Sequence, residues 1–356
     1  MVAHLCCSVD AGYFLKRLKE DFPNEKIVAY FYDPNIHPYS EFKLRSLDTK
    51  RICEKLNIEY YEGEYNYEGW LKVVKGKENE PEKGSRCLVC FDYSLEATAK
   101  FAKKIDEKNI TTSLLMSPMK SKEQLEHIGR VIKRKYGINF YAPDYRKKGG
   151  TQNQQLFAKE YQMYRQDYCG CIYGIWQQKK EQEIIDELLS PLTKQILPAS
   201  IEEKLNLYTK RIEYEKKGIK YKIIKENFLN YRLLRGLVKS EKKPVDSYII
   251  FYSYLNRNTK GKIDFIKDEI AYLNRMQVIF VEVNTFNKIL NKSYENVLEI
   301  IKNPPLIEEE LLFREKITNT AYSLSPIIIV DKIDKKYEIE INAKIYPDVR
   351  EILIKL

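Results

Sequence analysis

The sequence predicts an α/β fold: a mainly parallel sheet with helices on both faces, followed by a second domain of mixed α/β or α+β type. Three observations support this prediction. Apolar runs of strand length alternate with segments of helical periodicity over residues 1–171, which is the pattern of a parallel sheet. After Trp176 the chain becomes strongly charged and contains no further cysteine. Its 356 residues exceed the usual size of one domain, so two domains are expected.

The first domain opens with a strand, a loop and a helix. Val2–Val9 is an apolar run of strand length, and Ala11–Phe22 follows with apolar residues on one helical face. Cys6, Cys7 and Asp10 therefore lie at the C-terminal end of a strand, where open α/β sheets gather their ligands.

The same two patterns predict the other elements of the first domain, which we place over residues 1–178. Strands are expected over Lys26–Tyr32, Asn57–Tyr61, Thr111–Leu115 and Ile138–Tyr141. Helices are expected over Tyr39–Leu56, Tyr65–Val74, Leu88–Lys108, Ser121–Tyr136 and Asn153–Arg165. Prolines predict breaks in 33–38 and a turn over Ser117-Pro118-Met119-Lys120.

The remaining chain is expected to form a linker over 179–198 and an accessory domain over 199–356. The linker would begin with a charged helix, Lys179–Leu189, and continue through Pro191–Pro198. In the accessory domain we expect strands over Tyr248–Tyr254, Gln277–Val283, Ile327–Val330 and Tyr337–Ile345. Helices are expected over Lys204–Lys225 and near Ile263–Arg275, Tyr294–Ile301 and Ile307–Lys316. No catalytic motif occurs in this half.

The chain has a net charge of +10, from 61 basic and 51 acidic residues. Residues 1–178 hold 29 basic and 24 acidic residues, and the remainder holds 32 and 27. This excess favours a polyanionic partner, and the 28 tyrosines suit base stacking, but a solvated Lys/Glu surface explains the charge equally well.

Nothing in the sequence predicts a membrane or secreted protein. No apolar run reaches the ~18 residues of a membrane span. The N-terminal apolar run ends at Asp10, and Lys16 and Arg17 follow it, unlike a signal peptide. We therefore expect a cytoplasmic protein without a membrane partner.

Six of the seven cysteines form three close pairs: Cys6 with Cys7, Cys87 with Cys90, and Cys169 with Cys171. In a reducing compartment such pairs favour metal binding or redox chemistry. Cys87 and Cys90 lie on one face at a helix start, where the helix dipole favours thiolate. With Cys6 and Cys7 they would suit a [4Fe–4S] cluster or a tetrahedral zinc, and spacing alone does not decide between them.

Other polar residues allow more than one interpretation each. Cys169-Gly170-Cys171 would close into a strained, easily reduced disulfide or bind a second iron as dithiolate. Asp10 is a metal ligand, an acid or a helix N-cap. His4 and His37 are ligands, proton donors or structural histidines. Isolated Cys53 is expected to be buried, and His127 to lie on the surface.

Missing motifs exclude several classes of enzyme. The chain has no Gly-x-x-x-x-Gly-Lys-Ser/Thr loop and no Gly-x-Gly-x-x-Gly turn, so no ATP or NAD site is predicted. It also lacks the Cys-x-x-x-Cys-x-x-Cys triplet, which argues against a radical-SAM enzyme.

Six short motifs between His4 and Tyr173 match one known family in order. They are His4-Leu5-Cys6-Cys7 with Asp10; Phe31-Tyr32-Asp33-Pro34-Asn35-Ile36-His37-Pro38; Pro81-Glu82 with Gly84, Arg86, Cys87, Cys90 and Phe91; Ser117-Pro118 with Lys120; Arg146-Lys147-Lys148-Gly149-Gly150; and Tyr164-Arg165-Gln166 with Tyr168-Cys169-Gly170-Cys171. This segment resembles the QueH family of cobalamin-independent epoxyqueuosine reductases. Asp33 stands where the family more often has Asn, and Ser8-Val9 replaces Ala-Pro.

The resemblance implies a Rossmann-like domain that reduces the epoxide of epoxyqueuosine at the tRNA wobble position to the alkene of queuosine, the last step of queuosine biosynthesis. It implies a [4Fe–4S] cluster on Cys6, Cys7, Cys87 and Cys90, with an additional mononuclear iron nearby. It also implies a redox-active Cys169–Cys171 pair, which with Asp10 completes the set of potential metal ligands. The implied partners are the anticodon loop of tRNA and an external electron donor, and no cobalamin is expected.

The resemblance also suggests roles for other residues in these motifs. We hypothesise that Asp10 or His37 supplies a proton, and that Tyr32, Tyr164 or Tyr168 stacks a flipped base. Asn35 and Gln166 are expected to contact the substrate. The residues expected to hold anticodon-loop phosphates are Arg86, Lys120, Arg146, Lys147, Lys148 and Arg165.

Two other functions compete with this one. A non-catalytic, zinc-stabilised RNA-binding protein would use Cys6, Cys7, Cys87 and Cys90 structurally, but it leaves Cys169 and Cys171 unexplained. A tRNA thiolase of the ATP-pyrophosphatase type needs a Ser-Gly-Gly-x-Asp-Ser loop, which this sequence lacks.

Overall fold

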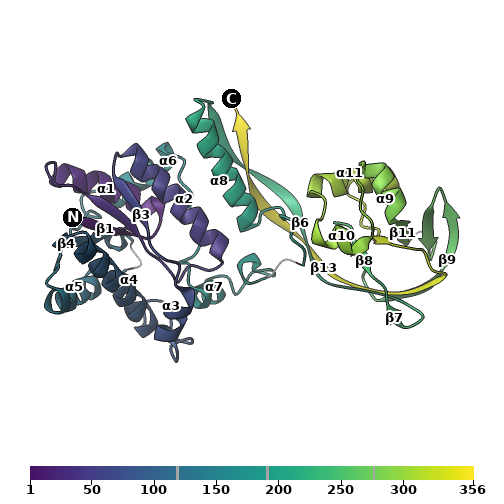
Figure 1. The fold of residues 1–356 in the computed structure, drawn as a ribbon, viewed down its shortest axis with the longest axis horizontal. Helices are drawn as coiled ribbons and strands as arrows, with labels where there is room; N and C mark the ends of the chain where they lie inside the picture. The colour runs from purple at the N-terminus through teal and green to yellow at the C-terminus, as the bar shows by residue number, and fades with distance from the viewer. Residues whose placement is uncertain (118–119, 190–191, 276) are drawn as a thin grey trace. The chain divides into compact units, whose positions relative to one another are not determined.

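The computed structural model describes residues 1–117, 120–189, 192–275 and 277–356 (Figure 1). Pro118, Met119 and Pro191, which belong to the expected turn and linker, lie outside these residues. The chain divides into two compact units. The first comprises residues 1–189, 204–223 and 353–356, and the second comprises 190–203 and 224–352. Residues 204–223, expected in the accessory domain, are therefore part of the first unit.

A five-stranded parallel sheet forms the centre of the first unit, in the order β3-β2-β1-β4-β5. Its strands are β1 (Val2–Leu5), β2 (Val28–Phe31), β3 (Glu59–Glu62), β4 (Asn109–Thr112) and β5 (Asn139–Phe140). Every residue of β1 and β2 is buried, as expected for apolar strands covered on both faces. The predicted parallel sheet is confirmed.

Helices cover both faces of this sheet. They are α1 (Ser8–Asp21), α2 (Tyr39–Lys55), α3 (Tyr67–Val74), α4 (Ser85–Lys104), α5 (Lys122–Tyr136), α6 (Gly150–Glu160) and α7 (Ile172–Gln178), with short 3₁₀ turns at Ser113–Met116 and Asp186–Leu188. In Figure 1, α1, α2 and α6 lie on one side of the sheet and α4 and α5 on the other. Accordingly, α1 packs against α2 and α6, and α4 packs against α3 and α5. None of the described helices is long and apolar enough to cross a membrane.

Two expected helices differ from the structure. The helix expected over Lys179–Leu189 is wrong: α7 ends at Gln178, and only a 3₁₀ turn follows. Residues 179–183 are all charged or polar, so no apolar packing continues α7 into this segment. The helix expected over Lys204–Lys225 forms as α8 (Ile201–Lys216) but ends early. Gly218 lies just beyond α8 with φ +65°, the left-handed conformation that commonly terminates helices.

The second unit holds most of an eight-stranded sheet with the order β7-β6-β13-β9-β10-β11-β12-β8. The strands are β6 (Tyr221–Ser240), β7 (Lys243–Pro244), β8 (Ser247–Ile249), β9 (Thr259–Lys267), β10 (Ile270–Leu273), β11 (Val278–Glu282), β12 (Ile327–Val330) and β13 (Lys336–Lys355). Its helices are α9 (Val283–Leu290), α10 (Val297–Lys302) and α11 (Ile307–Thr318). This mixed sheet with helices agrees with the predicted class.

The helix expected near Ile263–Arg275 is wrong, because these residues form the β9–β10 hairpin. Asp268 and Glu269, between the strands, have φ of +53° and +62°. Two consecutive residues at positive φ form the tight turn that suits the twist of a hairpin, and they cannot continue a helix.

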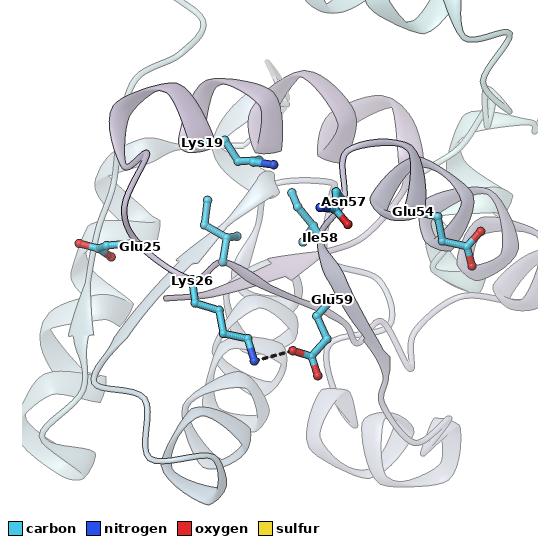
Figure 2. A pocket seen from close by; sticks show the side chains of 8 residues that line it. Lys19, Glu25, Lys26, Glu54, Asn57, Ile58 and Glu59 are labelled. Atoms are coloured by element: carbon cyan, nitrogen blue, oxygen red, sulfur yellow. Dashed lines mark ion pairs between the residues drawn. The ribbon is translucent and has the colours of Figure 1, made fainter.

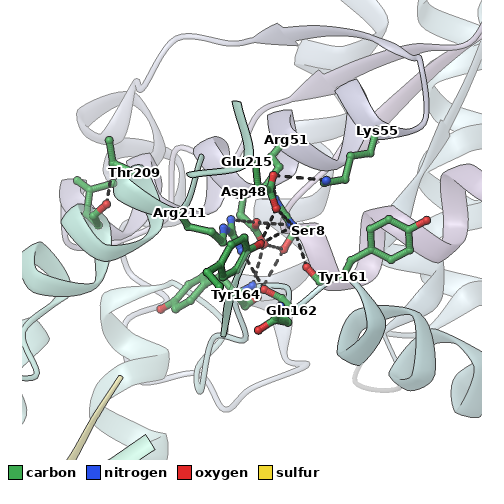
Figure 3. Close-up of polar contacts among 12 residues, drawn as sticks. Ser8, Asp48, Arg51, Lys55, Tyr161, Gln162, Tyr164, Thr209, Arg211 and Glu215 are labelled. Carbon is green, nitrogen blue, oxygen red and sulfur yellow. Dashed lines mark hydrogen bonds and ion pairs between the residues drawn. The ribbon is translucent and has the colours of Figure 1, made fainter. Parts of the chain in front are cut away.

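A buried carboxylate, Asp48 on α2, fixes α8 to the first unit (Figure 3). It accepts hydrogen bonds from Ser8 Oγ at 2.5 Å and from the Tyr164 backbone N–H at 2.8 Å, and it pairs with the guanidinium of Arg211 on α8. Arg211 also donates to the Gln162 carbonyl at 2.9 Å. Asp48 thus joins the start of α1, the segment after α6, and α8.

A second ion pair strengthens this attachment. Arg51 Nη2 lies 2.6 Å from Glu215 Oε1, and the Tyr221 hydroxyl donates to the same oxygen at 2.5 Å. Burial alone would raise the pKa of Glu215, but Arg51 and Tyr221 outweigh it and hold the pKa at about 2.

Replacing Arg211 with Met is expected to destabilise the first unit by about 3 kcal/mol, because it leaves the buried Asp48 without its main counter-charge. Urea unfolding of the full chain measures this loss. Arg17→Met is the matched control. Arg17 is 41% exposed; in the described chain its ion pairs are with Glu20 and Asp21 on its own helix, and its guanidinium lies 5.5 Å from the Tyr145 ring. A loss of about 1 kcal/mol or less is therefore expected. Equal stability losses in the two variants would contradict a structural role for Arg211.

Glu215→Gln is expected to flatten the acid dependence of stability. The folded pKa of Glu215 lies below its ordinary value of 4.5. Its stabilising contribution is therefore complete above pH 4.5 and is lost as the pH falls towards 2. We expect the natural chain to lose about 2 kcal/mol more than Glu215→Gln across this window. If urea unfolding gives the natural chain and Glu215→Gln the same dependence of stability on pH, this role of Glu215 is refuted.

Candidate metal and redox site

The first cysteine pair lies at the C-terminal edge of the parallel sheet. Cys6 and Cys7 follow β1 directly, and Ser113 follows the neighbouring strand β4. Cys6 Sγ lies 3.9 Å from Cys7 Sγ, 3.9 Å from Asp10 Oδ2 and 3.7 Å from Ser113 Oγ. One ligand atom each from Cys6, Cys7 and Asp10 lies within 4.8 Å of the others. Three of the expected ligands are therefore close enough to share one metal ion.

The surroundings of Cys6 and Asp10 favour their neutral forms. The pKa of Cys6 is raised by its contact with Cys7 and by burial. Burial raises the pKa of Asp10, although Gln154 Nε2 donates to Asp10 Oδ1 at 2.7 Å and opposes this shift. A bound cation would reverse the preference, because thiolate and carboxylate are the forms that bind metals.

The second pair, Cys87 and Cys90, lies in the first turns of α4. Cys87 Sγ accepts the Lys83 N–H at 3.3 Å, and Cys90 Sγ accepts the Nε1–H of buried Trp70 at 3.3 Å. Burial raises the pKa of both thiols. The expected effect of the helix start is therefore outweighed by desolvation, and an N–H donor already faces each sulfur.

The third pair lies in a loop held by backbone contacts. Cys171 forms an isolated antiparallel bridge with Ile36, and the His37 N–H donates to the Gly170 carbonyl at 2.8 Å. Gly170 has φ +114°, and a Cβ there would lie 2.9 Å from Ile36 Cγ1. Only glycine meets both conditions without strain.

Buried Arg45 supports the same loop from α2. It donates to the carbonyls of Cys169 and Tyr168 at 3.0 Å each, and Glu41 holds its Nε at 2.6 Å. The sequence interpretation missed Arg45 and Glu41. The sequence pattern that could have indicated them is an acidic and a basic residue four positions apart, in a predicted helix that follows the Ile36-His37 segment. This spacing places both side chains on one face of the helix.

Lys120 and Asp33 connect the three pairs electrostatically. Lys120 Nζ lies 3.4 Å from Cys169 Sγ, and although burial lowers its pKa, the charges of Cys169 and Cys87 raise it overall. Burial raises the pKa of Asp33 to about 7. Asp33 raises the pKa of Cys6 and of Cys90, and Cys169 raises that of Cys87 and of Cys90. The pairs therefore share one environment, although in the described chain only the first forms the 4.8 Å group.

All seven cysteines are free thiols. Cys53 is completely buried in the main core of the first unit, as expected, and burial raises its pKa to about 12. Cys53 does not belong to any of the three cysteine pairs.

The geometry favours structural roles for several residues expected to act on the substrate. Both ring nitrogens of fully buried His4 have partners at 2.9 Å, Thr112 Oγ1 and the Tyr32 carbonyl, and burial lowers its pKa to about 4. The rings of Tyr32, Tyr164 and Tyr168 are all buried. The stacking role expected for these tyrosines is not supported, because no face is open to a base.

Two of the expected phosphate contacts are used within the protein. Arg86 is buried and donates to the carbonyls of Lys77, Glu78 and Glu80 at 2.6–3.3 Å. Arg146 Nη1 donates to the carbonyls of Ser117 and Lys120 at 3.1 and 3.3 Å. Both arginines shape the loops around the site, and buried Arg86 is used for that alone. The Arg146 side chain is 24% exposed, so its phosphate contact stays a prediction.

Other expected substrate contacts keep free binding capacity. Lys147, Lys148 and Arg165 are exposed. Among the described residues, the buried acceptors Asn35 Oδ1 and Gln166 Oε1 have no hydrogen-bond donor. Each can accept a hydrogen bond from a ligand.

His37 is half-buried, and burial lowers its pKa. A neutral imidazole is a weaker acid than Asp10 or Asp33, whose pKa values are raised. Of the two proton donors proposed from the sequence, Asp10 therefore has the pKa shift that suits the role. Asp33, which follows β2 at the same sheet edge, is an acid that the sequence interpretation did not consider.

A surface hollow lies away from this edge (Figure 2). Its lining includes Ile27 and Ile58, just before β2 and β3 begin, together with Lys19, Lys26 and Glu59. Lys26 Nζ already pairs with Glu59 at 2.7 Å. Because all strands are parallel, the hollow lies at the opposite end of the sheet from Cys6 and plays no part in this site.

Comparisons with known proteins agree with these motifs. The family model for epoxyqueuosine reductase QueH matches residues 1–177. Epoxyqueuosine reductase QueH of Helicobacter pylori is 38% identical over 354 residues, which cover 94% of this chain and 95% of the relative. The protein of that name from Acinetobacter baylyi is 35% identical over 176 residues, 49% of this chain and 80% of the relative.

Among solved structures, a predicted tRNA methyltransferase subunit from Methanocaldococcus jannaschii aligns with a TM-score of 0.32 at 11% identity, covering 45% of this chain and 76% of that one. This likeness is too distant to carry an argument. The sequence relatives do carry one, because the H. pylori protein matches along nearly its whole length. The chain belongs to the QueH family of epoxyqueuosine reductases.

Proposed function

We propose that this chain reduces the epoxide of epoxyqueuosine at the tRNA wobble position to the alkene of queuosine, the last step of queuosine biosynthesis. The observation that carries the proposal is the convergence of Cys6, Cys7 and Asp10 at the sheet edge. Two further thiol pairs share its electrostatic environment. Membership of the QueH family supplies the substrate.

The donor set suits iron. Cys6, Cys7, Cys87 and Cys90 would hold a [4Fe–4S] cluster, with Asp10 available to a nearby mononuclear iron. When bound, such a cluster supplies single electrons at low potential. Thiols bind metals as thiolates, so binding such a cluster would release protons. Zinc on the same residues would serve only a structural role.

The reaction consumes two electrons and two protons, and releases the epoxide oxygen as water. Oxidation of the Cys169 and Cys171 thiols to a disulfide releases two electrons and two protons, so this pair matches the stoichiometry. An external donor of two electrons would then restore the dithiol. Lys120 Nζ lies 3.4 Å from Cys169 Sγ, and Asp10 or Asp33, whose pKa values are raised, would supply a proton to the departing oxygen.

The substrate nucleoside belongs to an anticodon loop, which carries phosphates on both sides of the wobble position. Lys120 is half-buried beside the thiols, whereas Lys147, Lys148 and Arg165 are exposed. We assign phosphate binding to these four residues. Asn35 and Gln166 offer unpaired acceptors to substrate hydroxyl groups.

Cys90→Ala in protein purified without oxygen is expected to lower iron and sulfide content and to reduce the turnover of epoxyqueuosine tRNA at least a hundredfold. Cys53→Ala is the matched control, since Cys53 is a buried thiol in the main core. It is expected to keep the visible absorption of the natural chain. Colourless natural protein that holds only zinc and still binds tRNA would instead indicate the zinc-stabilised RNA-binding protein.

Gly170→Ala is expected to abolish turnover while iron content stays unchanged, because φ +114° and the contact with Ile36 exclude a Cβ. Gly174→Ala is the control. It lies in α7, and its Cβ would meet Cys171 Cβ at 3.8 Å, an ordinary contact. A change in the conformation of the loop is detected by the rate at which the Cys169 and Cys171 thiols react with a disulfide reagent. Gly170→Ala protein with natural turnover and thiol reactivity would rule out this loop as a positioning device.

A further inference from the structure

The basic charge of the protein is unevenly distributed between its two units. The first unit holds 39 basic and 30 acidic residues, a net charge of +9, whereas the second holds 22 and 21. Residues 204–223 alone hold seven basic and two acidic residues. Their net charge of +5 equals the whole excess of the chain after residue 178. The accessory unit is therefore nearly neutral, and α8 with its C-terminal extension carries the charge.

The charged residues of this segment fall into two groups. Arg211 and Glu215 face the first unit and are paired with Asp48 and Arg51. By contrast, Lys210, Lys216, Lys217, Lys220 and Lys222 are exposed. Among the described residues, none of these five lysines forms an ion pair with a carboxylate, and Glu213 is the one exposed acidic side chain of 204–223. We call Lys216, Lys217, Lys220 and Lys222 the lysine strip.

The segment is anchored close to the Cys-Gly-Cys loop through α2. Arg45 of α2 binds the carbonyl of Cys169, and Asp48, one turn further along, binds Arg211 of α8. Three residues of helix span about 4.5 Å. In addition, the ring of Tyr208 on α8 packs 5.3 Å from that of Tyr164, five residues before Cys169. The lysine strip begins one residue after Glu215, which pairs with Arg51 and Lys55 at the far end of α2. It therefore lies about ten helical residues, ~15 Å, beyond Arg45, a distance that a bound tRNA spans easily.

The chemistry of the strip fits a phosphate backbone better than a lipid surface. Within 204–223 no large apolar side chain is among the exposed ones, whereas surface-binding helices need apolar residues to enter the lipid. Closely spaced, unpaired lysines are the usual contacts to nucleic acid phosphates.

We propose that the lysine strip binds the phosphate backbone of the substrate tRNA outside the anticodon loop, and so adds affinity without taking part in the reduction. This inference rests on the proposed function, which supplies the tRNA. It assigns RNA binding to a segment that follows the matched family region, residues 1–177, yet folds into the same unit.

The test compares two full-length variants with equal net charge. The strip variant is K216Q, K217Q, K220Q and K222Q. The control is K103Q, K104Q, K108Q and K133Q, four exposed lysines in α4, in α5 and just before β4, on the face of the sheet opposite α2. Each anaerobically reconstituted protein is titrated with tRNA carrying epoxyqueuosine over a range of salt concentrations, and kcat and KM are measured on the same tRNA.

The strip variant is expected to bind tRNA about tenfold more weakly at moderate salt. The slope of log K against log salt should fall by about 3, at roughly 0.7–0.9 for each phosphate that a lysine no longer neutralises. KM should rise with kcat unchanged, because the lysines do not touch the reacting atoms. The control should keep the affinity and slope of the natural chain.

Other results would overturn the inference. Unchanged affinity in the strip variant, or an equal decrease in both variants, would show that the strip makes no specific contact. The proposed function fails separately, if the natural chain binds this tRNA but does not reduce it. In that case the comparison of the two variants still decides whether the strip binds RNA.

Discussion

Asp48 is the buried charge on which the first unit depends. Its carboxylate oxygens are shared by Ser8, the Tyr164 N–H and Arg211, three groups that are far apart in the sequence. Burial alone would raise its pKa, but Arg211, Arg51 and Ser8 hold the pKa below its usual range. A charge without solvent needs this full set of partners. By binding these partners, Asp48 holds three parts of the chain in place. They are the start of α1 next to Cys7, the segment that leads to Cys169, and α8.

Helix α2 carries both the residue that binds the cysteine loop, Arg45, and the buried carboxylate Asp48. Arg45 holds the Cys169 and Tyr168 carbonyls while Glu41 neutralises it. Three helical positions away, Asp48 holds the chain just before that loop. The cysteine loop is therefore fixed by its backbone, which leaves the two sulfurs free for chemistry. Glycine at position 170 permits this arrangement because its φ is positive and Ile36 lies close.

The site combines buried and half-buried thiols, the half-buried carboxyl group of Asp10, the buried carboxyl group of Asp33, and one lysine. The contact with Cys7 and burial raise the pKa of Cys6, and burial raises the pKa of Cys90, Asp10 and Asp33. A bound cation would oppose these shifts. Lys120 provides positive charge beside Cys169. The H. pylori relative matches nearly the whole chain, whereas the A. baylyi relative matches about half of it. The three cysteine pairs lie within residues 1–177, which the family model matches, and the lysine strip lies beyond them.

The sequence by itself determined the parallel sheet, the three cysteine pairs and the family, because alternation of apolar runs and short motifs are local patterns. It failed where a single backbone angle decides, as at Gly218 and at Asp268-Glu269, since φ is not visible in a hydrophobic pattern. Only the tertiary structure showed that α8 joins the first unit and that Arg86 and Tyr168 are committed to internal contacts. It also identified Arg45 and Asp33 as neighbours of the thiols. The physical reason is that burial, and hence pairing and pKa, depends on residues brought together from distant parts of the chain.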